Sequence, residues 1–263
     1  MRNIPPYIAA RGVLRTSRGK LLLACAALGF AAVAHCAELV VSAAASLTDV
    51  FRDIGKSFEA AHAGTKLAFN FAATDVSLAQ ISKGAPADVL AAADETSMDR
   101  AEQDGLLLPG SRRDFATNRL VLIVPVNGAS PAKLDDLALP QFGRIAVGGP
   151  RTVPAGRYAM AALERAALWR RIEPKCVFAL NVRQVLDYVA RGDADAGFVY
   201  ATDAAIMHDK VRIALEIPTP TPVRYPAAVV RGTRHSDEAL TFVESLRAPP
   251  ARAQLSKYGF APP

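Results

Sequence analysis

Hydrogen-bond donors recur in this sequence where a short apolar strand is expected to pass directly into a helix. The stretch from residue 38 to residue 58 begins as an apolar strand and turns at Ser46 into an amphipathic helix. Such a junction directs the Ser46 hydroxyl and the first helical amides into a cleft at the carboxyl end of a sheet, which is where anions bind. The competing interpretation is that Ser46 only caps its helix, with Asp49 three residues further on.

Four further donors stand at comparable junctions: the hydroxyls of Thr74 and Tyr200 and the backbone amides of Ala155 and Val182. Thr74 follows a strand expected over residues 66–71, and we expect it to cap a helix that begins near Val76. Pro154 favours a first helical position and Asn181 favours an N-cap, so the amides that follow them lack an intrahelical acceptor. Each of these features taken singly is ordinary structure, and only their combination indicates a binding site.

Strands and helices alternate along the chain, which predicts an α/β fold with mostly parallel sheets. The pattern restarts after Ala116, so we expect two lobes: residues 38–117 as the first part of lobe I, 118–219 as lobe II and 220–263 as a return segment of lobe I. One crossing is expected near residues 116–119. The other is expected in the proline-rich run 218–222, where alternate prolines favour an extended connector. The same patterns predict a helix over residues 155–169 and a strand over residues 227–230.

Residues 1–37 have the composition of a secretory signal peptide. The first twenty residues carry five basic residues and no acidic one, and residues 21–34 form an apolar run that is too short for a comfortable membrane span. Ala32-Val33-Ala34 fits a cleavage signal of small residues. The alternatives are an uncleaved membrane anchor and a lipoprotein acylated at Cys36, although His35 occupies a position that should be small in a lipoprotein.

The basic character of the whole chain belongs mainly to this leading segment. Removing the five basic residues before residue 21 from the total of 31 leaves 26 basic against 25 acidic residues. A nearly neutral mature chain without a basic run argues against nucleic-acid binding. Cys176 is expected to stand alone in the mature chain, and the histidines lack ligand spacing, so neither a disulfide framework nor a metal site is predicted.

Six segments, in this order and over nearly the whole mature chain, resemble the periplasmic molybdate-binding proteins of ABC importers. They are AAASLT at 43–48, GAPAD at 84–88, VPAGRYA at 153–159, NVR at 181–183, VY at 199–200 and KYGF at 257–260. The resemblance implies a two-lobed periplasmic-binding-protein fold, type II-like, with a ligand cleft between lobes that are joined by two crossover segments. It also implies a periplasmic protein that is not an enzyme.

The resemblance assigns the oxyanion to two hydroxyls of one lobe and to two amides and a tyrosine hydroxyl of the other. Carried over by position, these donors are Ser46, Thr74, Ala155, Val182 and Tyr200. They would hold molybdate or tungstate through its oxygens, without direct ligation of the metal and without a cofactor. The expected partners are this anion and the membrane permease of an ABC importer, and the carrier is expected to be a monomer.

Neutral donors suit such a ligand on physical grounds. Fixed amides and hydroxyls replace the hydration shell of a dianion, and a site that offers only donors leaves the proton of hydrogen phosphate unpaired. Molybdate and tungstate carry no proton at neutral pH and are larger than sulfate. Cavity size would therefore separate them from sulfate but hardly from each other.

The second segment departs from the family pattern, because Asp75 places a carboxylate beside the presumed anion site. We expect this side chain to face away from the ligand and to serve its helix N-terminus. Ser77 is an alternative donor one helical turn along. Arg157 and Arg183 stand beside two of the amide donors, where they either tune the local potential or remain solvated or bridge the lobes.

Three other functions remain open from the sequence. The nearest is a binder of another oxyanion such as sulfate, or of a small organic anion. An exported hydrolase with Ser46 as nucleophile would need a base, but the sequence offers no Gly-x-Ser-x-Gly elbow and no convincing histidine and aspartate partners. A regulatory effector domain of the same fold would come with a DNA-binding domain, which the sequence lacks.

Overall fold

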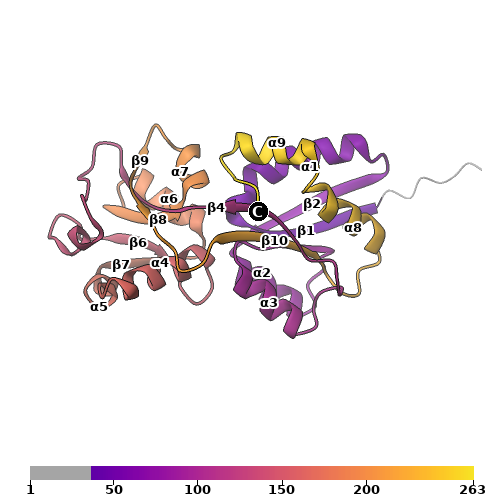
Figure 1. Cartoon of the computed structure of the whole chain (residues 1–263), viewed down its shortest axis with the longest axis horizontal. Helices are drawn as coiled ribbons and strands as arrows, with labels where there is room; N and C mark the ends of the chain where they lie inside the picture. The colour runs from indigo at the N-terminus through magenta and orange to yellow at the C-terminus, as the bar shows by residue number, and fades with distance from the viewer. Residues whose placement is uncertain (1–36) are drawn as a thin grey trace, which may run out of the picture. The chain divides into compact units, whose positions relative to one another are not determined.

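The computed structural model describes residues 37–263, which contain two five-stranded sheets with helices packed on them (Figure 1). The predicted signal peptide, its cleavage site and Cys36 lie outside these residues. We call the first sheet with its helices lobe I and the second sheet with its helices lobe II. Residues 35–263 group as one compact unit, so the division of the chain at residues 117 and 219 stays a prediction.

The sheet of lobe I has the strand order β2-β1-β3-β10-β4. Its strands are β1 (Ala37–Ala44), β2 (Thr65–Ala72), β3 (Val89–Ala91), β4 (Arg113–Asn118) and β10 (Val223–Val229). Its helices are α1 (Thr48–Ala61), α2 (Thr74–Ser82), α3 (Glu95–Gln103), α8 (Ser236–Ser245) and α9 (Pro249–Lys257). Figure 1 shows α1 and α9 on one side of this sheet and α2 and α3 on the other.

The sheet of lobe II has the strand order β7-β6-β8-β5-β9. Its strands are β5 (Leu120–Pro125), β6 (Ile145–Gly148), β7 (Cys176–Ala179), β8 (Ala196–Tyr200) and β9 (Val211–Ile217). Its helices are α4 (Pro154–Arg165), α5 (Trp169–Ile172), α6 (Val182–Ala190) and α7 (Ala201–Ile206), with short 3₁₀ turns at η2 (Leu134–Ala138) and η3 (Glu173–Lys175). The chain crosses between the sheets from β4 to β5 and again from β9 to β10.

The prediction of mostly parallel sheets is wrong, because β10 in lobe I and β5 in lobe II pair antiparallel with both of their neighbours. The other strand pairs are parallel, and they bring the candidate residues to one edge of each sheet. In lobe I, β1 runs parallel to β2 and to β3, and in lobe II, β6 runs parallel to β7 and to β8. The carboxyl ends of parallel strands lie at the same edge, so the segments that follow β1, β2 and β3 meet in lobe I and those that follow β6, β7 and β8 meet in lobe II.

The apolar face predicted for the first helix is present and packs into the core. Val50, Phe51, Ile54 and Phe58 of α1 are all buried. Phe51 packs against the ring of Phe115 from β4 with a centroid separation of 5.7 Å. The helix is therefore held by burial of one face, as its periodicity predicts.

Three predictions of local structure are wrong. Ser46 does not cap α1, because it lies inside a 3₁₀ turn, η1 (Ala45–Leu47), and α1 begins only at Thr48. Thr74 does not cap a later helix either, since it is the first residue of α2. The helix predicted over residues 155–169 ends at Arg165, because Ala167 adopts a positive φ of 56° before α5 begins.

No helix of the described residues has both the length and the apolar character needed to cross a membrane.

The start of α4 packs so closely on β6 that it leaves no room for a side chain at Gly156. A Cβ added there would lie 1.9 Å from the carbonyl oxygen of Gly148. We expect Gly156→Ala to push α4 off the sheet and to lower the unfolding free energy by about 1–3 kcal/mol, measured by urea denaturation. Gly143→Ala is the control, because its new Cβ would meet only Asp195 Oδ2 at 3.7 Å. Equal losses in the two variants would contradict this packing.

Candidate anion-binding site

The structure brings all five sequence-predicted residues into the lining of one small cavity between the lobes. Lobe I contributes Ala44, Ala45, Ser46, Ala72, Ala73, Thr74 and Ala93, and lobe II contributes Val153, Pro154, Ala155, Val182 and Tyr200. The centre of a water-sized sphere can occupy only about 10 Å³ of this cavity. None of these lining residues carries a charged side chain. The cavity therefore presents only neutral groups, and its volume is about that needed for one water molecule.

The two hydroxyls of lobe I each have one protein partner. Ser46 Oγ lies 3.0 Å from the hydroxyl of Tyr225, and Thr74 Oγ1 accepts a hydrogen bond from the Ala93 amide at 3.2 Å. Both side chains are buried. Because Thr74 accepts in its bond, its own hydroxyl proton remains available to a ligand.

The two amides of lobe II stand at helix N-termini. Ala155 follows Pro154, which starts α4, and Val182 is the first residue of α6. First-turn amides have no carbonyl one turn earlier to bond to, and neither amide donates to another group within residues 37–263. Asn181 Oδ1 accepts the Gln184 amide at 3.0 Å, so the predicted N-cap of α6 is confirmed. Both amides are thus fixed donors at the positive ends of helices.

Tyr200 ends β8 and carries its hydroxyl across to lobe I. The hydroxyl donates to the Ala93 carbonyl oxygen at 3.4 Å, which is a long hydrogen bond. The ring is buried, and this burial raises the pKa of Tyr200 well above its ordinary value. The side chain therefore remains a neutral donor at physiological pH.

Asp75 is not part of the cavity lining. Its buried carboxylate accepts hydrogen bonds from Ser97 Oγ at 2.8 Å and from the guanidinium groups of Arg100 and Arg157. Asp75 faces away from the cavity and stands in the first turn of α2, as expected, but its oxygens bond to side chains of other elements and not to the amides of that helix. Ser77, the alternative donor, is buried without a hydrogen-bond partner for its Oγ and does not line the cavity.

Arg157 bridges the lobes beside the Ala155 amide. From α4 it donates to Asp75, to Asp94 Oδ2 through Nε at 3.2 Å and Nη2 at 2.5 Å, and to Ser97 Oγ at 2.8 Å. Burial on its own would lower the pKa of Arg157, but Asp94 and Asp75 raise it overall. The guanidinium therefore neutralises two carboxylates of lobe I instead of facing the cavity.

Arg183 makes a second bridge beside the Val182 amide. It donates to Asp203 of its own lobe at 2.6 Å, to Asp49 of α1 at 2.7 Å and to the Ser46 carbonyl oxygen at 3.2 Å. Burial raises the pKa of Asp203, and the attraction of Arg183 opposes that rise. Of the roles left open by the sequence, the geometry supports bridging for both arginines.

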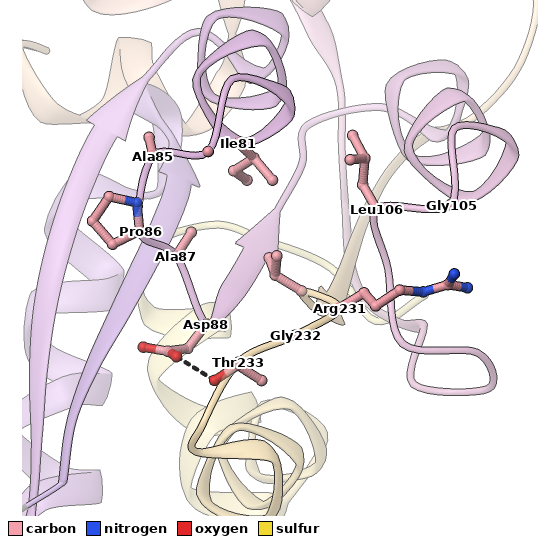
Figure 2. A pocket seen from close by; sticks show the side chains of 12 residues that line it. Ile81, Ala85, Pro86, Ala87, Asp88, Gly105, Leu106, Arg231, Gly232 and Thr233 are labelled. Atoms are coloured by element: carbon pink, nitrogen blue, oxygen red, sulfur yellow. Dashed lines mark hydrogen bonds between the residues drawn. The ribbon is translucent and has the colours of Figure 1, made fainter.

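A larger pocket, with a volume of about 480 Å³, lies elsewhere on lobe I and contains none of the five donors (Figure 2). The GAPAD segment at residues 84–88 lines it. Asp88 holds this region together, because it accepts the Val40 amide at 2.7 Å and the hydroxyl of Thr233. This segment therefore supports the fold of lobe I and does not contribute to the cavity between the lobes.

Residues 39–261 match the family of bacterial extracellular solute-binding proteins. The chain belongs to this family. A putative ABC transporter substrate-binding lipoprotein of Bacillus subtilis, YvgL, is 38% identical to this solute-binding protein over 84% of its chain and 85% of the relative. The molybdate-binding protein ModA of Escherichia coli is 35% identical over 91% and 96% of the two chains.

Solved structures agree with the fold. The periplasmic molybdate-binding protein of Azotobacter vinelandii superposes with a TM-score of 0.73 at 26% identity, over 86% of this chain and 99% of that chain. The sulfate-binding protein SubI of Mycobacterium tuberculosis gives a TM-score of 0.74 at 16% identity, over 86% and 87% of the chains, which shows the fold alone. The predicted α/β, two-lobed periplasmic-binding-protein fold is thereby confirmed.

The sequence reasoning missed the residues behind the cavity. Tyr225, Asn118 and Asp94 contact the predicted donors or their neighbours, yet none was singled out. Tyr225 was missed because the strand expected over residues 227–230 begins four residues earlier, at Val223. The alternation of apolar residues at 223, 225, 227 and 229 was the available signal for the longer strand.

Removing the Arg157 bridge tests whether the ion pairs hold this solute-binding protein closed. Arg157→Ala deletes charge-assisted hydrogen bonds, each worth about 1.5–3 kcal/mol, so we expect a roughly 10- to 100-fold shift toward an open form. Small-angle X-ray scattering of the purified protein would detect it as a larger radius of gyration. Arg170→Ala is the control, because Arg170 is exposed and forms no ion pair within the described chain. Unchanged scattering from Arg157→Ala would contradict the bridging role.

Proposed function

We propose that this solute-binding protein captures molybdate or tungstate outside the cytoplasmic membrane and delivers it to an ABC importer. The observation that carries the proposal is the set of neutral donors from both lobes around one small cavity without a charged lining residue. The molybdate-binding relatives support the choice of ligand, and the family supports export. In this proposal the carrier is a monomer, needs no cofactor and meets a membrane permease in the periplasm.

The proposed ligand contacts are divided between the lobes. The hydroxyls of Ser46 and Thr74 donate from lobe I, and the amides of Ala155 and Val182 donate from lobe II. The Tyr200 hydroxyl also donates from lobe II, after its single proton turns from the Ala93 carbonyl oxygen to the ligand. An anion that accepts from both sets binds the closed form more tightly than the open form, so its binding shifts the population toward closure. Closure then distinguishes the loaded carrier from the empty one at the permease.

The chemistry of the lining supports an anion that carries no proton. A ligand hydroxyl, as in hydrogen phosphate, needs an acceptor, and a site built of donors leaves that hydroxyl unpaired at a cost of about 1–3 kcal/mol. Sulfate also lacks a proton at neutral pH, so discrimination against it rests on the fit of the donors around a larger tetrahedron.

The same lining argues against catalysis. Ser46 Oγ lies beside a tyrosine hydroxyl, and neither a histidine nor a carboxylate lines the cavity among the described residues. A serine nucleophile needs an adjacent base to take its proton. We therefore propose a binding role for Ser46 and no enzymatic activity for the protein.

Calorimetric titration of the purified, ligand-free protein with molybdate, tungstate, sulfate and phosphate tests the proposal. We expect tight one-to-one binding of molybdate and tungstate, no measurable binding of phosphate, and an affinity about 10- to 100-fold weaker in Ser46→Ala and in Tyr200→Phe. Ser57→Ala and Tyr258→Phe are matched controls, because their hydroxyls bond to Asp53 on the surface. A wild-type protein that ignores both molybdate and tungstate would overturn the proposed ligand.

The pH dependence of binding reports on Tyr200. Burial raises its pKa above the ordinary tyrosine value of about 10, so the neutral donor form persists as the pH rises through that value. We expect the molybdate affinity measured by calorimetry to stay flat from about pH 7 to 9.5. A loss of molybdate affinity with a midpoint below about pH 9.5 would contradict the buried, neutral state of Tyr200 if Tyr200→Phe does not show the same loss. Such a result would show that Tyr200 titrates in this range.

A further inference from the structure

A chain of polar side chains stands behind Ser46, outside the cavity lining. Tyr225 of β10 is completely buried, with its hydroxyl 3.0 Å from Ser46 Oγ. Asn118 Nδ2 lies 3.3 Å from the same Tyr225 hydroxyl and 2.9 Å from Thr202 Oγ1. Ser46 is thus the last member of a chain that begins at Asn118.

The direction of these hydrogen bonds follows from Asn118. Its Oδ1 accepts the Arg119 amide at 2.9 Å, which fixes the side-chain amide so that its NH₂ group faces Tyr225 and Thr202. An NH₂ group only donates, so the Tyr225 oxygen accepts from Asn118. The single Tyr225 proton is then available to Ser46 Oγ. Either hydroxyl of this pair could donate, but the Tyr225 proton has no other acceptor among the described residues, so we assign Tyr225 as the donor and Ser46 as the acceptor. The Ser46 proton then has no acceptor among these side chains.

The Thr74 hydroxyl also has its proton free to face the cavity, because its oxygen accepts a hydrogen bond from the Ala93 amide. Each hydroxyl of lobe I thus has one of its two lone pairs used by a protein donor, and its proton is free to face the cavity. A serine without such a partner could rotate and present either its proton or a lone pair to a ligand. The hydrogen bond from Tyr225 restricts this rotation at Ser46 and favours presentation of the proton.

We propose that Tyr225 and Asn118 are positioning residues that orient the Ser46 hydroxyl as a donor and thereby set the preference for unprotonated anions. This inference rests on the proposed function, since it concerns the same site. Neither residue touches the ligand, and both act through Ser46.

The surroundings hold Tyr225 in place for this role. Its ring packs edge-on against Tyr200 and Phe260, with centroid separations of 5.8 and 5.3 Å. The pairing of β10 with β4 shifts register between Tyr225 and Pro226, an irregularity of the kind that re-aims a side chain near a site. Burial also raises the pKa of Tyr225 well above its ordinary value, so the proton that it gives to Ser46 is always present. The KYGF segment at 257–260 thereby contributes Phe260 to the support of the site.

The hydrogen-bonded series of Asn118, Tyr225 and Ser46 also depends on lobe closure. Asn118 is the last residue of β4, where the polypeptide leaves lobe I, whereas Thr202 belongs to α7 of lobe II. The bond from Asn118 to Thr202 therefore joins the lobes at the crossing and steadies the amide that feeds Tyr225. The orientation of Ser46 is completed in the closed form that holds the ligand.

Tyr225→Phe tests the proposal because it removes the hydroxyl and keeps the buried ring. We expect molybdate affinity to fall about tenfold, the loss of one hydrogen bond, while the melting temperature of the ligand-free protein stays close to that of the wild type. The ratio of molybdate to arsenate affinity should fall as well, because a freed Ser46 oxygen can accept the proton of hydrogen arsenate. Tyr258→Phe is the matched control and should leave both affinities unchanged.

A double-mutant cycle separates positioning from general packing. If Tyr225 acts through Ser46, Tyr225→Phe has no further effect on molybdate affinity in a Ser46→Ala background. Additive losses of molybdate affinity in the double variant, or an unchanged affinity in Tyr225→Phe alone, would overturn the positioning role of Tyr225. Either result would leave the proposed function intact. A wild-type protein that does not bind molybdate would overturn the proposed function and this inference with it, so the two failures are distinguishable.

Discussion

The site depends on backbone amides and hydroxyls that fold without satisfying their own hydrogen-bonding capacity. A buried donor without an acceptor is costly, and a protein tolerates it where a ligand completes the bond. Here the first turns of α4 and α6 leave two such amides at one cavity, and the two hydroxyls opposite have their oxygens occupied from behind. The sheet topology positions these groups, because the strand-to-helix junctions that carry them follow parallel strands and lie at the edges of the two sheets that line the cavity.

Charge is kept close to these donors but outside their cavity. Arg157 and Arg183 stand one or two residues after the donor amides, yet each is paired with carboxylates that include one from the opposite lobe. A guanidinium in the cavity would attract any anion of suitable size, including protonated ones. By pairing both arginines across the cleft, the chain keeps their charge out of the cavity lining, which consists of neutral groups.

Local sequence signals marked five residues that the structure brings to one cavity, whereas long-range contacts determine the hydrogen-bond partners of their side chains. The prolines, caps and strand ends that mark Ala155, Val182 and Tyr200 are local, and they were readable. The expected capping roles of Ser46 and Thr74 are wrong because Ser46 lies in a 3₁₀ turn and Thr74 begins α2. Their hydroxyls bond instead to Tyr225, 179 residues away, and to the Ala93 amide of the same lobe. Asp75 likewise pairs with Arg157, which lies 82 residues further along the sequence, and no local sequence pattern predicts this pairing. Propensity yields to tertiary context at such positions.

The ion pairs between the lobes lie outside the cavity lining, so their contribution to closure is separate from the hydrogen bonds that a ligand makes. A ligand shifts an opening equilibrium only by its difference in affinity for the two forms. Where Arg157 and Arg183 already favour closure, the anion needs to add only the free energy of its own hydrogen bonds. Under the proposed function, the charged clusters set how readily the lobes close, and the neutral cavity sets which anion keeps them closed. Separating these two tasks between different residues lets a carrier adjust its affinity without altering its selectivity.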